Sequence, residues 1–365
     1  MLAAILFFTS RGKPHSPPAT STTKSPQTLA SEPGRSMKPG TSATPPADAT
    51  PTKPKLEVCG VTDLPPAVGD AVEVSQYLFD TTRETYDRWK TALINDTDSR
   101  ARAVGLALQR VDDTFAKSLA ADTSLEQLIG LATTTQDPDI YSIAVGFCHT
   151  GLGDGEAPVP LCRRLSLSEW AKLDPDNAVP WLANAAAARQ KGDSWAESAA
   201  FAQASQAHKV DGDNEALLAT AMAAFPADAT LSARFAAEIR LWGYDAARAR
   251  PDFSELSRYC TPTALEQSQV HDQCEAMADL LVDHGGTLLD FSRGRLIGQR
   301  LGWPAARVDL LAQEKDALLQ LLASKAGAED WSCGHMAWTD NFLQRRLQIG
   351  ELAALRELRD KKSSQ

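Results

Sequence analysis

The stretch that decides the fold is residues 165–209, LSLSEWAKLDPDNAVPWLANAAAARQKGDSWAESAAFAQASQAHK. A first helix is expected to end where the turn-forming run DPDN begins at 174. A second helix is predicted over 178–191, a Gly-Asp pair interrupts it, and a third helix is predicted over 194–209. Because so short a turn joins the last two helices, they are expected to pack as an antiparallel hairpin.

The chain beyond residue 74 repeats this pattern. Apolar residues recur three and four positions apart in almost every segment, and single helices are predicted over 77–93 and 341–360. Alternation of β-branched residues over more than four positions occurs nowhere, so strand signals are nearly absent. The sequence therefore predicts an all-α fold, built as an array of antiparallel helical hairpins.

The stretch 165–209 resembles a tetratricopeptide repeat. Small residues at set positions let the paired helices approach, and large residues fill the space between them. The positions that carry the resemblance are Pro175, Trp181, Ala185, Phe201 and Ala204, while 184, 188 and 197 depart from the pattern. The resemblance covers about 40 residues and implies a TPR-like superhelix that binds other proteins, with packing roles for these five residues. A plain helical hairpin without the repeat family's function is the alternative.

A second resemblance covers the whole chain, which looks like exported helical proteins of Gram-negative bacteria. The pattern around Leu301-Gly302-Trp303-Pro304 carries it most clearly. This resemblance implies an exported compartment and a helical fold, and it implies no activity.

The N-terminal residues differ from the rest in composition. Residues 1–8, MLAAILFF, are apolar, and residues 9–55 hold 10 of the 21 prolines and a net charge of +5. An apolar stretch, a basic flank and a Pro/Ser/Thr-rich segment follow one another in membrane-anchored domains. We therefore expect 1–8 to be the remnant of an N-terminal membrane anchor, 9–55 to be a disordered linker and 56–365 to be the helical-repeat domain. A short disordered apolar N-terminus is the alternative.

The six cysteines indicate structural disulfides. Cys148 and Cys162 are fourteen residues apart, as are Cys260 and Cys274, and the even count with a repeated spacing favours an oxidising compartment. We predict these two bonds and, by elimination, a bond between Cys59 and Cys333. The alternative is a set of buried thiols.

The bond between Cys260 and Cys274 requires a break in the helical pattern of 262–284. A continuous helix would hold the two Cα atoms too far apart for a disulfide. Ser268 is the expected cap of a new helix. The zinc-competent group of Cys260, His271, Cys274 and His284 matches no zinc-finger spacing, so we expect no metal there.

Composition and motifs narrow the function to two classes. The net charge of -10 argues against a nucleic-acid partner, and no catalytic, metal or cofactor motif is present, so we expect neither enzyme activity nor a cofactor. The first class is a periplasmic interaction scaffold for a protein partner, tethered to the inner membrane through the N-terminal anchor alone. The second is an envelope hydrolase with a site built from helix-borne carboxylates. A pocket lined by two carboxylates and an exposed tryptophan would favour the second class.

Overall fold

A computed structural model of the protein describes seven stretches of the chain: 58–61, 71–115, 121–149, 160–212, 215–247, 254–325 and 331–363. These residues form sixteen α-helices and two short 3₁₀ helices, with isolated β-bridges as the only extended pairing among them. The all-α prediction is therefore confirmed. The expected anchor at 1–8 and the expected linker at 9–55 lie outside the described residues.

The first five described helices follow one another as packed neighbours: α2 Ala71–Thr81, α3 Arg83–Ile94, α4 Ser99–Phe115, α5 Ala121–Thr135 and α6 Pro138–His149. The single helix predicted over 77–93 is in fact α2 and α3, which are separated at Thr82. Asp98 and Asp137 begin the helices that follow them, because their carboxylates accept hydrogen bonds from first-turn amides of α4 and α6.

The decisive stretch forms α7 Leu167–Leu173, α8 Ala178–Gln190 and α9 Ser194–Ala204, after a 3₁₀ turn at Pro160–Arg164. Polar side chains cap all three helices: Ser166, Asn177 and Asp193 each accept a hydrogen bond from a first-turn amide. The third helix is shorter than predicted, because the chain leaves the helix after Ala204 and Lys209 pairs with Asn177 in a parallel bridge.

The chain then returns to its first helices. Helices α10 Glu215–Ala223 and α11 Leu231–Ala247 pack against α4, and α16 Cys333–Ile349 packs against both α10 and α11. Helix α17 Glu351–Ser363 follows α16. The single helix predicted over 341–360 is wrong, because Gly350 adopts a φ of 85° and divides the segment there.

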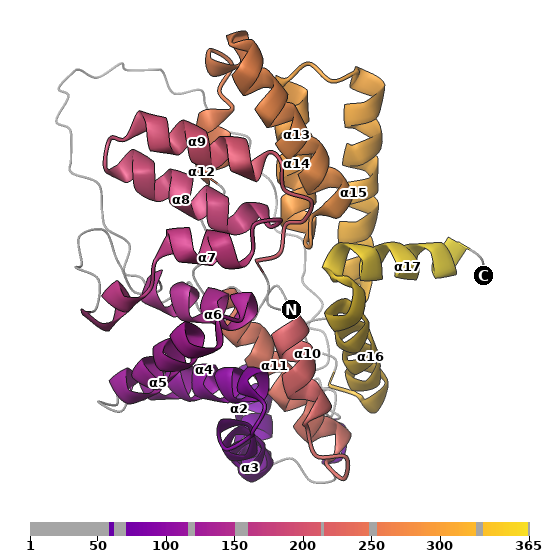
Figure 1. Ribbon diagram of the computed structural model, residues 1–365. Helices are drawn as coiled ribbons and strands as arrows, with labels where there is room; N and C mark the ends of the chain where they lie inside the picture. Colours follow the sequence, from indigo (N-terminus) through magenta and orange to yellow (C-terminus); the bar gives the residue numbers. More distant parts are fainter. Residues whose placement is uncertain are drawn as a thin grey trace, which may run out of the picture.

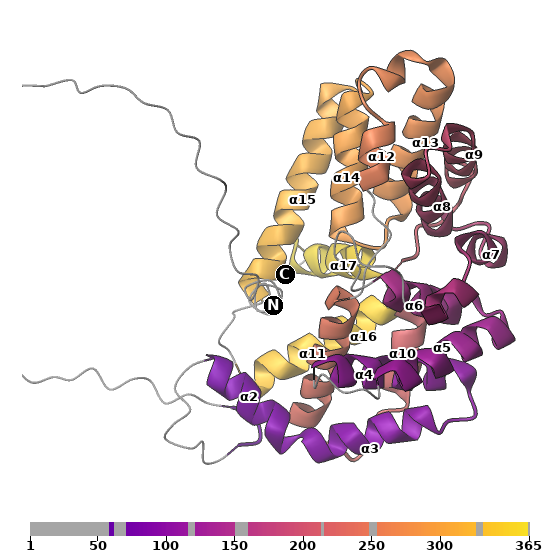
Figure 2. The ribbon, with the colours of Figure 1, turned by 90° about the vertical axis from the view of Figure 1, so that its left-hand side faces the viewer.

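The remaining helices are α12 Ser254–Tyr259, α13 Ser268–His284, α14 Leu288–Arg300 and α15 Ala305–Lys325, with a 3₁₀ turn at Ala264–Glu266. Figures 1 and 2 show two groups of helices, one above the other. The lower group holds α2–α6, α10, α11 and α16, and the upper group holds α8, α9 and α12–α15. Helices α7 and α17 lie between the groups. Because the lower group contains α2–α6 together with α10, α11 and α16, it is assembled from separate parts of the sequence.

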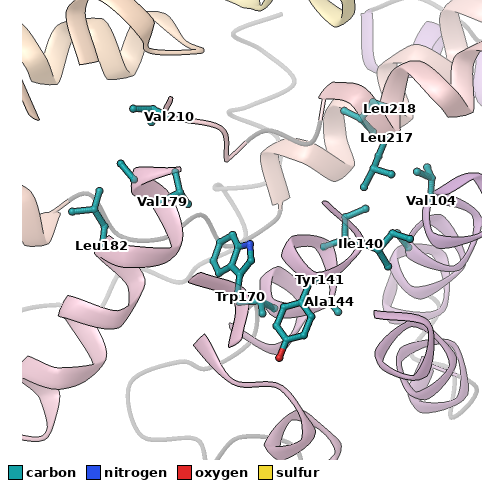
Figure 3. Close-up of a cluster of buried hydrophobic side chains, with 14 of the residues drawn as sticks. Val104, Ile140, Tyr141, Ala144, Trp170, Val179, Leu182, Val210, Leu217 and Leu218 are labelled. Atoms are coloured by element: carbon teal, nitrogen blue, oxygen red, sulfur yellow. The ribbon is translucent and has the colours of Figure 1, made fainter. Parts of the chain in front are cut away.

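One hydrophobic core joins the two groups. Trp170 of α7 is 1% exposed and lies between Tyr141 and Ala144 of α6 and Leu182 of α8 (Figure 3). A smaller cluster contains Val58 and Cys59 together with apolar residues of α2, α11 and α16. The first described residues are thus packed against the C-terminal helices.

Candidate functional site

The five positions that carry the repeat resemblance lie in the α8–α9 hairpin and the turn before it. Ala185, Phe201 and Ala204 are buried, as close packing of the two helices requires. Trp181 is half-buried, and its indole Nε1 donates a hydrogen bond to the carbonyl oxygen of Pro175 at 2.9 Å. Phe201 also stacks on Tyr259 of α12 with 3.7 Å between ring centroids, and this contact joins the hairpin to α12.

All three predicted disulfides are present: Cys59–Cys333, Cys148–Cys162 and Cys260–Cys274. Their Cα–Cα distances are 4.5, 5.6 and 5.8 Å, inside the range that the bond allows. The helical pattern of 262–284 does break, as the third bond requires. The cap position is Gln267, one residue before the predicted Ser268, and it makes no side-chain hydrogen bond to the helix.

The cysteine and histidine group that could have bound zinc does not form a site. Cys260 and Cys274 are joined to each other, and both are fully buried. Within the described stretches, no three His, Cys, Asp or Glu side chains come together as metal ligands.

A groove on the lower group is lined by both apolar and uncharged polar residues. It has a volume of about 500 Å³ and is formed by the end of α3 and one side of the α4–α5 pair. Ile94, Leu106 and Leu131 give it apolar surface, and Gly130 leaves space because nothing lies within 4 Å of the position that its Cβ would take. The remaining lining residues are Asn95, Arg102, Gln127, Thr134 and Thr135.

The groove carries a single charged residue, Arg102, and no carboxylate. The hydroxyls of Thr134 and Thr135 donate to helix carbonyls at 2.7 and 3.0 Å, so their hydrogen-bonding capacity is partly used within α5. The exposed side chains of Arg102 and Gln127 make no hydrogen bond or ion pair with other described residues. They are the donors that the groove offers to a ligand.

A second hollow, of about 690 Å³, lies along α2 and α3 and has a different character. Its lining is almost entirely charged: Asp80, Arg83, Glu84, Asp87, Arg88 and Thr91. Asp80 and Arg83 already form an ion pair at 3.6 Å. Exposed charges of both signs on one helix face are typical of a solvated surface, so we assign no ligand to this hollow.

The structure also contains a pair of carboxyl groups from different helices, as the hydrolase alternative would need. Glu238 of α11 is 3% exposed and faces Asp340 of α16. Arg234 Nε lies 2.6 Å from an oxygen of Asp340 and 3.6 Å from Oε1 of Glu238. Neither carboxyl oxygen of Glu238 accepts a hydrogen bond from the described residues.

The protonation of this pair follows from its surroundings. Burial, with the adjacent Asp340, raises the pKa of Glu238 to about 10. Burial by itself would also raise the pKa of Asp340, but hydrogen bonds with Glu238, Gln344 and Arg234 outweigh it, and the pKa is lowered. Glu238 is therefore the protonated partner near neutral pH, and its proton supplies the hydrogen bond that its oxygens otherwise lack.

The carboxyl pair is not placed for catalysis on an external substrate. Both oxygens of Glu238 are closed off from solvent in the α11–α16 interface. The most exposed tryptophan among the described residues, Trp195, begins α9 in the upper group (Figure 1). The carboxylates and the exposed tryptophan that would mark a hydrolase are thus not brought together.

Sequence analysis did not predict the α4–α5 groove or the Glu238–Asp340 pair. In the sequence, Arg102 and Gly130 look like ordinary residues of amphipathic helices. The one feature that could have pointed to the groove is Gly130, a glycine inside a helical pattern. The two carboxyl groups are 102 positions apart in the chain, and no local spacing connects them.

No family model, curated protein or solved structure matches the chain. Within the described stretches, no helix combines the length and the apolar character needed to cross a membrane.

Proposed function

We propose that this chain is a protein-interaction scaffold of the periplasm, tethered to the inner membrane through its N-terminal residues. Three disulfides are compatible with an oxidising compartment. The tether rests on the apolar residues 1–8 and on the basic, proline-rich segment that follows them. The TPR-like packing of α8 and α9, extended to a superhelical array, is part of the same proposal.

The observation that carries the proposal is the groove between α4 and α5. Apolar residues, a small residue and uncharged polar residues line it, and helical proteins use such grooves to hold the apolar face of a peptide. A substrate pocket for chemistry would need a nucleophile or an accessible acid–base pair. The groove lining contains amides, threonine hydroxyls and one guanidinium instead.

The charge of the groove defines its occupant. The chain outside residues 9–55 has a net charge of -15, yet the groove presents an arginine without a neighbouring carboxylate in its lining. An exposed arginine beside apolar residues pairs well with a carboxylate that is next to an apolar side chain. We therefore propose a protein partner with an amphipathic segment in which Asp or Glu flanks the apolar face.

A peptide-binding experiment tests this assignment. The full chain is titrated into fluorescent amphipathic helical peptides with leucines on one face and a single Glu at varied positions. The variant Gly130→Leu adds a large side chain at a groove residue whose Cβ position is open. Ala323→Leu on the exposed side of α15 adds the same side chain far from the groove and is the matched control.

Three results together support the groove. The wild-type chain and Ala323→Leu bind at least one peptide with a micromolar Kd, Gly130→Leu loses binding, and Arg102→Glu weakens it by about tenfold. When the peptide's Glu is replaced by Gln, the wild type and Arg102→Glu should bind the peptide with the same Kd. Equal binding by Gly130→Leu and the wild type, or no binding of any peptide, would overturn the proposal.

The compartment is tested separately in intact cells. When cells express the protein from its own gene, all six cysteines are expected to resist alkylation until a reductant is added, and the protein is expected in the membrane fraction. A reduced protein in the soluble cytosolic fraction would contradict both the periplasmic location and the tether.

A further inference from the structure

The three disulfides differ sharply in their access to solvent. Cys260 and Cys274 are fully buried, while Cys148 is half-buried and Cys162 is buried. In the third bond, Cys59 is buried but Cys333 is exposed. Thiol–disulfide exchange needs a thiolate to reach one sulfur, so the Cys59–Cys333 bond, with the exposed Cys333, is the most accessible of the three in the folded protein.

The position of Cys333 also favours its release as a thiolate. It is the first residue of α16, a helix of 17 residues. The positive end of the helix dipole stabilises a negative charge there and lowers the pKa of a thiol. Because the helix dipole stabilises the Cys333 thiolate, the Cys59–Cys333 bond should be easier to reduce than a disulfide enclosed in a core.

The bond holds a short segment against the body. Val58 forms a parallel bridge with Trp331, and the amide of Cys59 donates to the carbonyl of Trp331 at 2.9 Å. Val58 is also buried beside Phe235 and Met336. Together with the packing of Cys59 and Val61 in the same small cluster, these contacts hold residues 58–61 against α2, α11 and α16.

We propose that the Cys59–Cys333 bond is a reducible clamp and the site of exchange with a reduced protein dithiol. The partner's thiolate attacks Sγ of Cys333, the S–S bond breaks, and Cys59 leaves as a thiolate that takes up a proton. The partner's second thiol then attacks the mixed disulfide and frees Cys333. Two electrons and two protons pass to this chain, and the partner is left with a disulfide.

Opening the clamp would lengthen the connection that precedes α2. The segment between Val58 and the start of α2 at Ala71 would no longer be fixed to α16 at one end. At full extension it spans about 45 Å. If the N-terminal residues tether the body to a membrane, as proposed above, reduction would increase the distance that the body can reach by up to that length. The clamp itself does not depend on the tether or on the groove.

The test follows the three bonds in the full folded chain. The protein is incubated with graded concentrations of dithiothreitol without denaturant, free thiols are blocked with iodoacetamide, and peptide mapping identifies the alkylated cysteines. Near-ultraviolet circular dichroism reports in parallel whether the core stays packed. Cys59 and Cys333 are expected to be alkylated at least about tenfold faster than the other four cysteines, with the spectrum largely retained.

Two further measurements separate accessibility from general fragility. Gly334→Leu places a large side chain next to Cys333, where the atom nearest to the new Cβ is Ser332 Oγ at 3.9 Å, and it should slow reduction severalfold, while Gly334→Ala should not. A thioredoxin with its second active-site cysteine replaced by serine should be trapped on Cys333 in wild type. Earlier reduction of either other disulfide, loss of the spectrum together with the first thiols, or trapping on another cysteine would overturn the proposal.

Discussion

The α8–α9 hairpin and the α11–α16 interface are both pairs of packed helices, but they are made in opposite ways. The hairpin is closed by Ala185, Phe201 and Ala204, which lie within twenty residues of one another. The interface joins Arg234 to Asp340 across 106 positions and buries Glu238 beside them. The first is apolar and local, and the second contains charges and depends on distant parts of the chain.

This contrast shows where sequence patterns carry information. Spacing, turn residues and caps describe a local hairpin well, because its partners lie a few turns apart. A distant interface requires chain closure over more than a hundred residues, and it holds polar groups whose partners no pattern reveals. The disulfide Cys59–Cys333 lies at this interface, so the interface also has the largest covalent loop of the molecule, with a separation of 274 residues.

The largest predicted effect comes from opening that loop. Removing a cross-link restores closure entropy to the unfolded chain, by about 5–6 kcal/mol for a loop of this length and about 3 kcal/mol for the fourteen-residue loops. Cys59→Ser with Cys333→Ser should therefore cost more stability in urea unfolding than Cys148→Ser with Cys162→Ser. Equal losses would show that the distant interface is held mainly by its noncovalent contacts.

The two tryptophans of the decisive stretch should differ. Trp170→Ala removes a side chain that is 1% exposed and joins α6 to α8, and a loss of about 3–5 kcal/mol is expected. Trp181→Ala removes a half-buried ring with a hydrogen bond to Pro175, and the loss should be about half as large. Chemical denaturation of both variants measures the difference. A greater loss of stability in Trp181→Ala would show that the repeat-like packing of the hairpin contributes more than the contact of Trp170 between the two groups.

The buried carboxyl pair predicts a pH dependence. Because the folded-state pKa of Glu238 is about 10, against 4.5 for the free side chain, the folded state holds a proton that the unfolded chain has lost between these values. Stability should therefore fall as pH rises from 5 to 9, by about 1 kcal/mol per unit from this group. Glu238→Gln stays neutral at every pH and should flatten the slope.

Two controls accompany that measurement. Glu275→Gln on α13 removes an exposed carboxylate and should leave the slope as it is in wild type. Asp340→Asn removes a charge that raises the pKa of Glu238, so the fall in stability should end at a lower pH than in wild type but should not disappear, because burial of Glu238 remains. An unchanged slope in Glu238→Gln would show that Glu238 is ionised in the folded protein.

The smallest predicted effect belongs to the groove. Gly130→Ala lies inside α5 with open space around the new methyl group, so it should raise stability by about 0.5–1 kcal/mol through helix propensity. Thermal unfolding of the variant against wild type measures it. A loss of stability would mean that the groove closes in solution and that the glycine is needed for packing.

The outcome of the sequence analysis follows the same division. The helix predicted from 178 does begin there, because the side chain of Asn177 accepts a hydrogen bond from the amide of Val179 and so lies next to the group it caps. The two disulfides that close fourteen-residue loops could be chosen from their repeated spacing, and Cys59–Cys333 was then left by elimination. The helix expected over 341–360 failed at Gly350, where a left-handed backbone conformation interrupts an otherwise continuous apolar pattern.

The sequence was enough to predict that the protein is helical, where several helices begin, and two of the three disulfides, because these features depend on residues close in the chain or on helix geometry; Cys59–Cys333 followed only by elimination. Only the tertiary structure decided that α10, α11 and α16 pack with α4, that Glu238 faces Asp340, and that Arg102 and Gly130 border one groove. The physical reason is that amphipathic faces bury apolar area against any complementary face, and the hydrophobic effect carries no direction. Which faces meet is settled by the packing of the whole chain.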